Sequence, residues 1–229
     1  MHEAPAVNLA ALIDEARTLA LRNATLLSLV VAAIAGSFTG IDWYIAVNPD
    51  ANGVLLLNSL FGLVISLFVQ YRVTEQMLAD RWPSDRARPT RSYGALFGLS
   101  LLSGLAIAAG LIVLVVPGIY LAGRWLTAVP RLVENELSGS DALRAAWADS
   151  AHSDFVFAIA YLISLSPLLA AVALGFAMEG DVFLDSFTML ASVIFNLANG
   201  LFSVLGWVLA VAAFRLCVPV RDQTMDVFA

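Results

Sequence analysis

Six apolar runs separated by polar loops constrain this chain more than any other feature. About 20 helical residues cross a hydrocarbon core about 30 Å thick, and a crossing segment must satisfy its backbone hydrogen bonds internally. With 60% hydrophobic and 13% charged residues, the chain also lies outside the composition of soluble globular proteins. We therefore predict an all-α fold, a single-domain polytopic membrane bundle with six transmembrane helices at residues 24–47, 54–69, 94–116, 119–133, 155–178 and 188–214.

The arginines indicate how this bundle is inserted in the membrane. All basic residues are Arg, and all but Arg124 fall in alternate connections or at the ends of the chain, so that every second loop has none. Because basic residues mark cytoplasmic loops, we expect both termini on the cytoplasmic side of the membrane. The use of Arg without Lys in an Ala-rich chain indicates a bacterial source, for which we expect the inner (cytoplasmic) membrane. The residues expected on the cytoplasmic side are Arg17, Arg22, Arg72, Arg81, Arg86, Arg88, Arg91, Arg131, Arg144, Arg215 and Arg221.

The run at 119–133 is the shortest of the six. At about 1.5 Å per residue it reaches only about 22 Å, so it either crosses a locally thinned membrane or forms a re-entrant hairpin. If it failed to cross after the preceding run had crossed, the acidic loop 179–185 would become cytoplasmic and the arginines of the C-terminal tail would be exported. The charge rule therefore favours the crossing alternative.

Two further segments have the periodicity of amphipathic helices. Residues 7–22 place their apolar side chains on one helical face, and we expect this helix to lie at the membrane surface before the first span. The second helix, at 140–150, follows the fourth span, and Ser140 can cap it. Leu143, Ala146, Trp147 and Ser150 share one of its faces, and Trp147 is expected to anchor that face at the interface.

The stretch 116–147 is the most distinctive part of the sequence. Pro117 and Gly118 predict a tight turn between two apolar helices, because Pro cannot continue the helical ladder and Gly tolerates the conformation that follows. The stretch has the form PG-YL--R-----P---E-------AL---W. The matching residues are Pro117, Gly118, Tyr120, Leu121, Arg124, Pro130, Glu134, Ala142, Leu143 and Trp147.

This pattern resembles the bacterial six-helix inner-membrane proteins related to the membrane domain of some glycerophosphoryl diester phosphodiesterases. Ala146 departs from the pattern, because Ser commonly precedes the Trp in that family. The resemblance implies an inner-membrane protein without an assigned activity of its own. It does not imply phosphodiester hydrolysis, because the chain has no cluster of His, Glu and Asp to bind the metal that such chemistry uses.

Arg124 lies inside an apolar run, where a charge costs about 2.5 to 3.5 kcal/mol, so we expect it to face protein or water. Asn58, Asn196 and Asn199 fall at comparable depths, and the last two share a helical face at spacing i, i+3. These four residues form the candidate ligand site or polar cluster. The alternative is structural, with interhelical Asn hydrogen bonds and Arg124 extended outward to the headgroups.

Two GxxxG patterns, Gly36 with Gly40 and Gly94 with Gly98, permit close approach of helices. Such spacing is common within polytopic chains. We therefore expect these glycines to pack against helices of the same chain rather than against a second copy.

No group of residues in the sequence specifies a reaction. The net charge of −6 argues against a nucleic-acid partner. Cys217, His2 and His152 are too few for a metal or haem site, and no Ser has a His as base, so we expect no metal, no cofactor and no enzymatic activity.

The predicted role is a structural or accessory subunit, or an assembly factor, of an envelope complex. Its expected partners are the lipid bilayer and other membrane proteins, and homo-oligomerisation is left open. The alternative is a small transporter or channel-like protein that binds an anionic or lipidic ligand near Arg124.

Overall fold

The structure is a computed structural model that describes residues 6–48, 52–82, 92–178 and 185–218, with side chains described in all of these except 52–61, 177–178 and 185–188. The described residues form helices and no strand, which confirms the all-α prediction. In chain order the helices are α1 (Leu9–Arg22), α2 (Ala24–Val47), α3 (Asn52–Met77), the short 3-10 helix η1 (Ala79–Arg81), α4 (Tyr93–Val113), α5 (Val115–Arg124), α6 (Ala128–Asn135), α7 (Gly139–Asp149), α8 (Asp154–Met178) and α9 (Asp185–Cys217).

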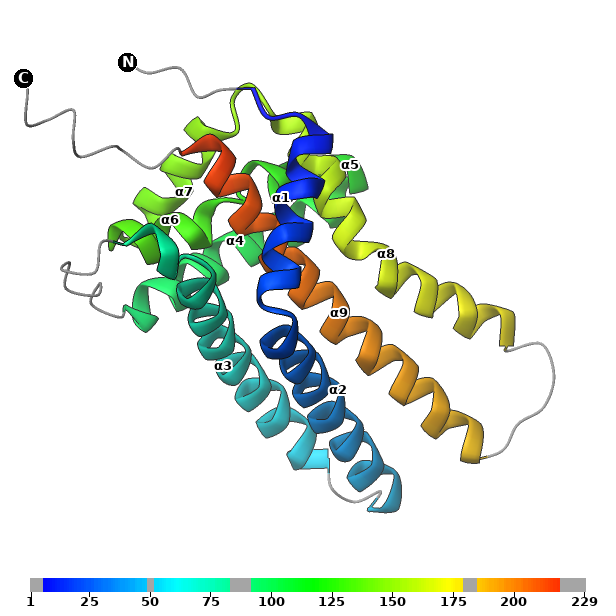
Figure 1. Cartoon of the computed structure of the whole chain (residues 1–229). Helices are drawn as coiled ribbons and strands as arrows, with labels where there is room; N and C mark the ends of the chain where they lie inside the picture. The colour runs from blue at the N-terminus through cyan, green and yellow to red at the C-terminus, as the bar shows by residue number, and fades with distance from the viewer. Residues whose placement is uncertain (1–5, 49–51, 83–91, 179–184, 219–229) are drawn as a thin grey trace, which may run out of the picture.

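Two antiparallel pairs of helices form the long part of the molecule. The pair α2 and α3 runs away from the end that holds α1 and returns to it, and α8 and α9 do the same (Figure 1). Helix α9 is central, because α2 and α8 both pack along it and α1 packs against it near Arg215. The start of α1 and the end of α9 therefore lie at the same end of the molecule.

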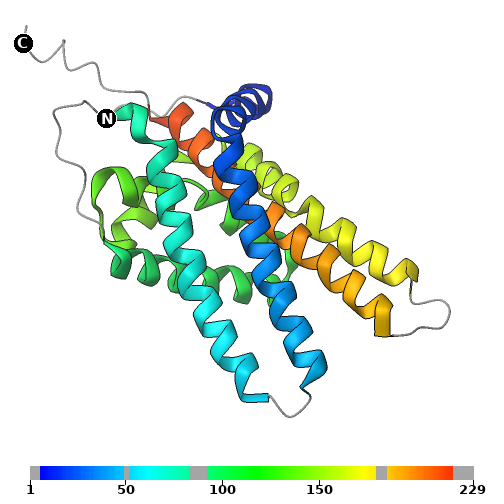
Figure 2. The same ribbon diagram turned by 60° about the horizontal axis from the view of Figure 1, so that its bottom comes forward.

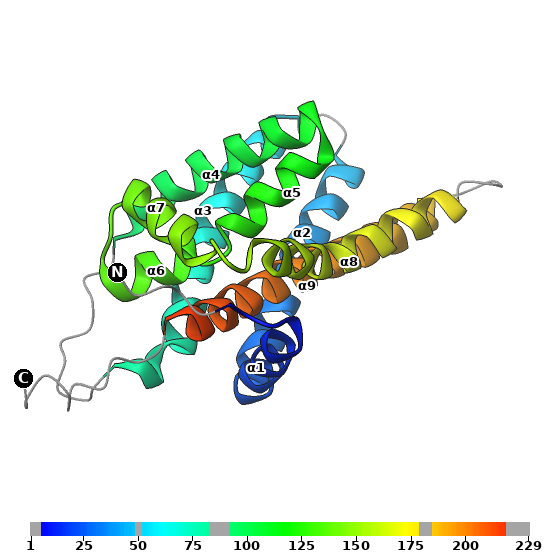
Figure 3. The same ribbon diagram turned by 90° about the horizontal axis from the view of Figure 1, so that it is seen from above.

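Helices α4 and α5 differ from the predicted pair of full crossings. Helix α4 has 21 residues, but α5 has only 10, which is about 15 Å of helix. A turn from Trp125 to Thr127 separates α5 from α6. The two helices of this hairpin lie side by side (Figure 3) and run at a steep angle to α2 and α3 (Figure 2). The expected continuous span over 119–133 is therefore wrong.

The hairpin of α4 and α5 also removes the charge argument for a full membrane crossing by residues 119–133. It carries the chain out from α3 and back to α6 at the same end, so the loop charges stay on one side whatever depth the hairpin reaches. Its tip is apolar and open, since Ile112, Val113 and Val116 are 85%, 76% and 76% exposed. A re-entrant hairpin thus satisfies the same charge rule.

The turn between α4 and α5 lies at Leu114, which has an extended backbone, rather than at Pro117 and Gly118. Pro117 occupies the first turn of α5, where its missing N–H is tolerated. Gly118 is helical, and none of the described glycines has a positive φ. Gly118 is instead required by packing, because a Cβ on it would lie 2.5 Å from Cγ and 2.7 Å from the backbone nitrogen of Leu111.

The glycines of the two GxxxG patterns do not pack as predicted. A Cβ added at any of these four glycines would have no atom within 4 Å in the described part of the chain. Close helix contacts form elsewhere: a Cβ on Gly123 would lie 2.6 Å from the backbone nitrogen of Ala158 in α8, and one on Gly139 would lie 2.9 Å from that of Leu99 in α4. These contacts hold α5 on α8 and α7 on α4.

We call the end of the molecule that holds α1, η1, α6, α7 and the adjoining ends of α3, α5, α8 and α9 the head. The apolar face of α1, with Leu12 and Leu19, is buried against α9, so the predicted amphipathic helix is present and its apolar face contacts protein. Helix α7 is also present, but its cap is Ser138, which accepts a hydrogen bond from the backbone N–H of Asp141. The predicted cap at Ser140 is wrong.

Away from the head, the long helices expose apolar side chains. Within the described residues, four helical segments are long and apolar enough to cross a membrane: Ala24–Val47, Tyr93–Val113, Asp154–Phe176 and Met189–Cys217. Most of the first three segments is unburied in the chain, whereas 56% of the last, which is central, is buried. These segments indicate a membrane protein whose apolar surface faces lipid.

Candidate functional site

A cavity of about 1010 Å³ lies between α2, α3 and α4, and residues of α9 form part of its wall. Ligand sites in proteins are mostly apolar and have volumes of about 300–1,000 Å³. The wall of this cavity is largely apolar, with Phe38 from α2, Leu63 from α3 and Phe97 from α4. Its few polar side chains include Asn199 and Ser203 of α9. The cavity is therefore of the size and polarity of a site for an apolar ligand.

A second hollow of about 580 Å³ adjoins this cavity on the side of the head. Val30 and Val69 line both, so the two hollows are neighbours between α2 and α3. The second hollow has a mixed lining of polar and apolar side chains, and we call it the mouth. Its polar residues are Arg22, Asn23, Thr25, Arg72 and Gln76.

The two arginines of the mouth are only loosely held. Arg22 Nη1 lies 3.7 Å from the carboxylate of Asp80, and the side chain of Arg22 is 63% exposed. Arg72 is 44% exposed, and its Nη1 donates a hydrogen bond of 2.9 Å to Glu75. An exposed ion pair such as that of Arg22 with Asp80 contributes about 0–1 kcal/mol, whereas Glu75, the partner of Arg72, is buried. Arg22 therefore remains available to an anion, and Arg72 can bind one through the donors that Glu75 does not use.

Asp80 is engaged mainly by another arginine. Arg215 donates two hydrogen bonds, of 2.8 and 3.0 Å, to its carboxylate. Burial raises the pKa of Asp80, but the hydrogen bond and the charge of Arg215 lower it by more, so that the pKa lies below its usual value. Asp80 is thus ionised and bonds mainly to Arg215, so that Arg22 makes only a weak contact with its carboxylate.

Two buried ion pairs hold the short helices of the head together. Arg131 donates hydrogen bonds of 2.7 and 2.5 Å to Asp149, and Arg81 donates one of 3.1 Å to Glu134. Both guanidinium groups lie over the buried ring of Phe214, at 5.4 and 5.1 Å from its centroid. Burial lowers the pKa of Arg131, but Asp149 raises it by more. These contacts join α6, α7, η1 and α9, and they give the motif residue Glu134 a structural role.

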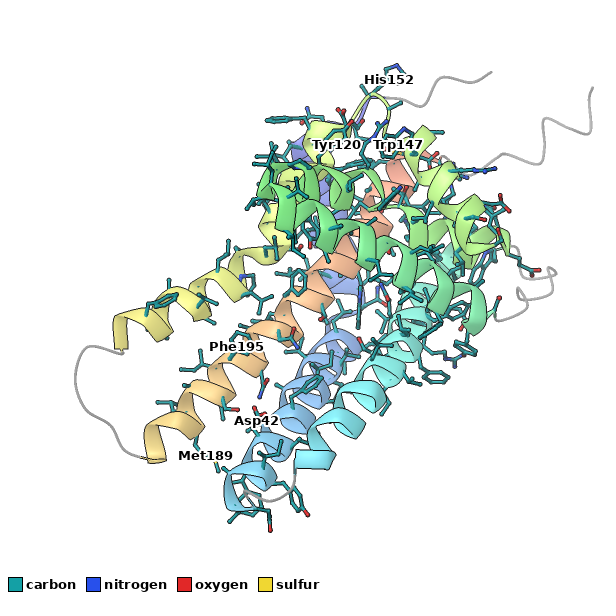
Figure 4. The ribbon with its side chains drawn as sticks, turned by 180° about the vertical axis from the view of Figure 1, so that it is seen from behind. Asp42, Tyr120, Trp147, His152, Met189 and Phe195 are labelled. Carbon is teal, nitrogen blue, oxygen red and sulfur yellow. The ribbon has the colours of Figure 1, made fainter. Side chains whose placement is uncertain are left out.

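Arg124 lies in the head and not among the asparagines. It is the last residue of α5 and is 7% exposed. Its guanidinium lies 4.2 Å from the centroid of the Trp147 ring and 5.8 Å from that of Tyr120. Figure 4 shows these two rings at the same end as His152. The sequence had predicted Arg124 at the depth of the asparagines in a crossing helix. That prediction is wrong, because α5 is too short to place Arg124 at that depth.

Asn196 forms a separate polar cluster between α2 and α9. Its side-chain amide donates to Asp42 at 2.8 Å, to Thr39 at 3.3 Å and to Ser192 at 3.2 Å, and Ser192 also donates to Asp42. In Figure 4, Asp42 lies far from the head, toward the opposite end of the long helices. Among the described side chains, Asn196 therefore bonds to α2 rather than to Arg124, and it joins two helices as in the structural alternative.

Asn199 lines the cavity, and the side chain of Asn58 lies outside the described residues.

The motif at 116–147 does bring its residues together: the rings of Tyr120 and Trp147 meet edge to face at 6.3 Å, and both lie against the same guanidinium. Residues of two short helices, α5 and α7, thus form one cluster.

The residues of the mouth were not predicted as a site. Arg22 and Arg72 enter the sequence interpretation only as markers of topology. Each lies at the head end of an apolar run, and consecutive runs that form a hairpin bring such ends together. Asp42 was also missed, although a lone carboxylate inside an apolar run is a signal of a polar contact in the membrane.

Comparison of the chain with protein-family models, with curated proteins and with solved structures gives no match. The resemblance inferred from the 116–147 pattern therefore stays a prediction. Among the described residues, no group of three or more His, Cys, Asp or Glu side chains is arranged to hold a metal ion.

Proposed function

We propose that this chain is a non-enzymatic integral membrane protein that holds an anionic phospholipid between α2, α3 and α4. The observation that carries the proposal is that a large apolar cavity lies directly beside a mouth lined by two arginines. A phospholipid has the same two parts, since its acyl chains are apolar and its headgroup carries the charge. The cavity would take the chains and the mouth would take the phosphate.

The headgroup supplies the selectivity of this site. Lipid chains surround the protein everywhere, so apolar contact alone gives little preference for one position. Arg22 and Arg72 can each donate charge-assisted hydrogen bonds to phosphate oxygens, and Asn23, Thr25 and Gln76 supply neutral polar groups beside them. Basic pockets between membrane helices on the cytoplasmic side are suited to anionic headgroups in this way.

The positive-inside rule supports a cytoplasmic head, and the arginine-rich, lysine-free composition supports a bacterial inner membrane. In that orientation the mouth opens at the level of the inner leaflet. This keeps the lipidic ligand of the transporter-like hypothesis but moves its site from Arg124 to the α2 and α3 pair.

A second candidate function is an accessory subunit of a larger membrane complex. The open glycine faces of α2 and α4 favour it, because small residues without a neighbour in the chain allow another helix to approach closely.

Native mass spectrometry tests the lipid site. The purified protein is offered equal amounts of phosphatidylglycerol and phosphatidylcholine, and bound lipids are counted. We expect the wild type to retain one phosphatidylglycerol in preference, and the double variant Arg22→Ala/Arg72→Ala to retain about tenfold less, since two charge-assisted contacts are lost. The matched control is Arg17→Ala/Arg144→Ala, which removes two exposed charges from the same end.

Equal retention of the two lipids by the wild type would contradict the proposal. So would an equal loss in both double variants, because a general loss of charge would then explain it. A protein that carries no lipid but forms dimers cross-linked through cavity residues would mean that a helix of a second copy fills the cavity, which also overturns the proposal.

A further inference from the structure

We infer that Arg124 is the core of a second anion site, distinct from the mouth, which binds a phosphate group beneath Tyr120 and Trp147. The other well-buried arginines of the head have carboxylate partners, as the pairs of Arg81, Arg131 and Arg215 show. Arg124 is as buried as these but has no carboxylate within 4.0 Å among the described residues.

The guanidinium of Arg124 has a buried donor with no partner in the described part of the chain. Its Nε is buried and has no hydrogen-bond partner among the described residues, and its described side-chain contacts are with the faces of two rings. Ring faces attract the charge but leave the in-plane N–H donors free. A buried charge without a hydrogen-bonded partner is costly, so the arrangement is that of a site awaiting an anion.

The position of the rings shows where such an anion would lie. Tyr120 and Trp147 are 38% and 40% exposed, so the guanidinium is only one layer below the surface. Tyr and Trp are the residues that occupy the headgroup level of a bilayer, and a planar guanidinium matches phosphate oxygens bidentately. The ligand chemistry is therefore a phosphate group, either of a lipid headgroup or free in solution.

One nearby carboxylate opposes an anion. Asp154 accepts a hydrogen bond of 3.3 Å from the hydroxyl of Tyr120 and is the carboxylate linked most directly to the aromatic cover. Its charge orients Tyr120 but repels a phosphate. Replacement of Asp154 by Asn should therefore strengthen anion binding, whereas replacement of Arg124 should weaken it.

Isothermal titration calorimetry tests this site in the Arg22→Ala/Arg72→Ala background, so that its outcome does not depend on the mouth. The detergent-purified, delipidated protein is titrated with dihexanoyl phosphatidylglycerol and, separately, with inorganic phosphate at constant ionic strength. We expect Arg124→Ala to lower the affinity at least tenfold, Arg124→Lys to lower it less, and Asp154→Asn to raise it. Arg144→Ala, which removes an exposed charge from α7, should leave it unchanged.

Binding of phosphatidylglycerol alone would identify a lipid headgroup site, and binding of both probes would identify a site open to soluble phosphate. Either result supports the inference if it depends on Arg124. If Arg124→Ala does not fold, Arg124→Lys and Asp154→Asn carry the test. Absence of binding in the background protein, or the same affinity in it and in the Arg124 and Asp154 variants, would overturn the inference.

Discussion

Replacement of Gly123 by Ala tests the close packing of α5 on α8. The new Cβ would lie 2.6 Å from the backbone nitrogen and 2.8 Å from the Cα of Ala158, whereas ordinary contacts begin near 3.4 Å, so the helices must separate by about 0.8 Å. Backbone atoms cannot rotate away, so we expect a cost in the upper part of the range of about 1–3 kcal/mol for overpacking. The better helix propensity of Ala returns about 1 kcal/mol, which leaves a net loss of about 1–2 kcal/mol.

For a chain of this size, that loss lowers Tm by about 2–8 °C. Thermal unfolding in detergent, followed by circular dichroism, measures it. Gly98→Ala is the matched control, because it also lies inside a helix but its Cβ would meet nothing within 4 Å. We expect this control to melt at or slightly above the wild type. A Gly123→Ala protein that melts as high as Gly98→Ala would refute the packing argument.

Three further changes test the head and the topology. Asp149→Ala leaves its buried arginine partner unpaired, so a loss of about 3–5 kcal/mol is expected as a strong fall in the folded fraction on gel filtration. Burial raises the pKa of Asp80 less than its arginine partner lowers it, so this pair stabilises the fold above the unfolded pKa of about 3.8 and the stability is lost as pH falls through the folded pKa. Asp80→Asn should therefore reduce the fall of Tm at acid pH. A fall as steep as that of the wild type would contradict this role of Asp80. In a background without the native cysteine, Asn48→Cys should react with an impermeant thiol reagent in intact spheroplasts and Ser140→Cys should not, and the reverse pattern would invert the topology.

Hydrophobic periodicity predicted the helices well, because each apolar run is long enough to specify its own backbone conformation. The first run was expected at 24–47 and forms α2 at the same residues. The amphipathic segments 7–22 and 140–150 also form helices, within one or two residues at each end. Length and polarity are local properties, so the sequence contains them directly.

Tertiary contacts were harder to predict. Pro117 and Gly118 have the composition of a turn, but the turn lies at Leu114, because what Gly118 provides is room for the side chain and backbone of Leu111. The break after Arg124 depends on how α5 and α6 pack in the head, which no local pattern records. For the same reason Arg124 could be identified as exceptional while its partners were assigned wrongly.

The proposed lipid site keeps the ligand class expected from the sequence but places it elsewhere in the bundle. A lipidic or anionic ligand was expected from one arginine in an apolar run, but the cavity lies between α2, α3 and α4 and its mouth uses Arg22 and Arg72. Helical geometry places residues on faces, yet the space between three helices depends on their crossing angles. A cavity is therefore a property of the packed bundle and cannot be read from any one run.

Photo-crosslinking with a phosphatidylglycerol that carries a diazirine on its acyl chain tests the central claim most directly. Membranes that contain the protein and this lipid are irradiated, and the modified peptides are mapped by mass spectrometry. A bound lipid predicts adducts concentrated on cavity residues such as Phe97 and Leu101, and their loss in Arg22→Ala/Arg72→Ala. Adducts spread equally over exposed positions outside the cavity, such as Leu169 and Phe176 of α8, would contradict the account.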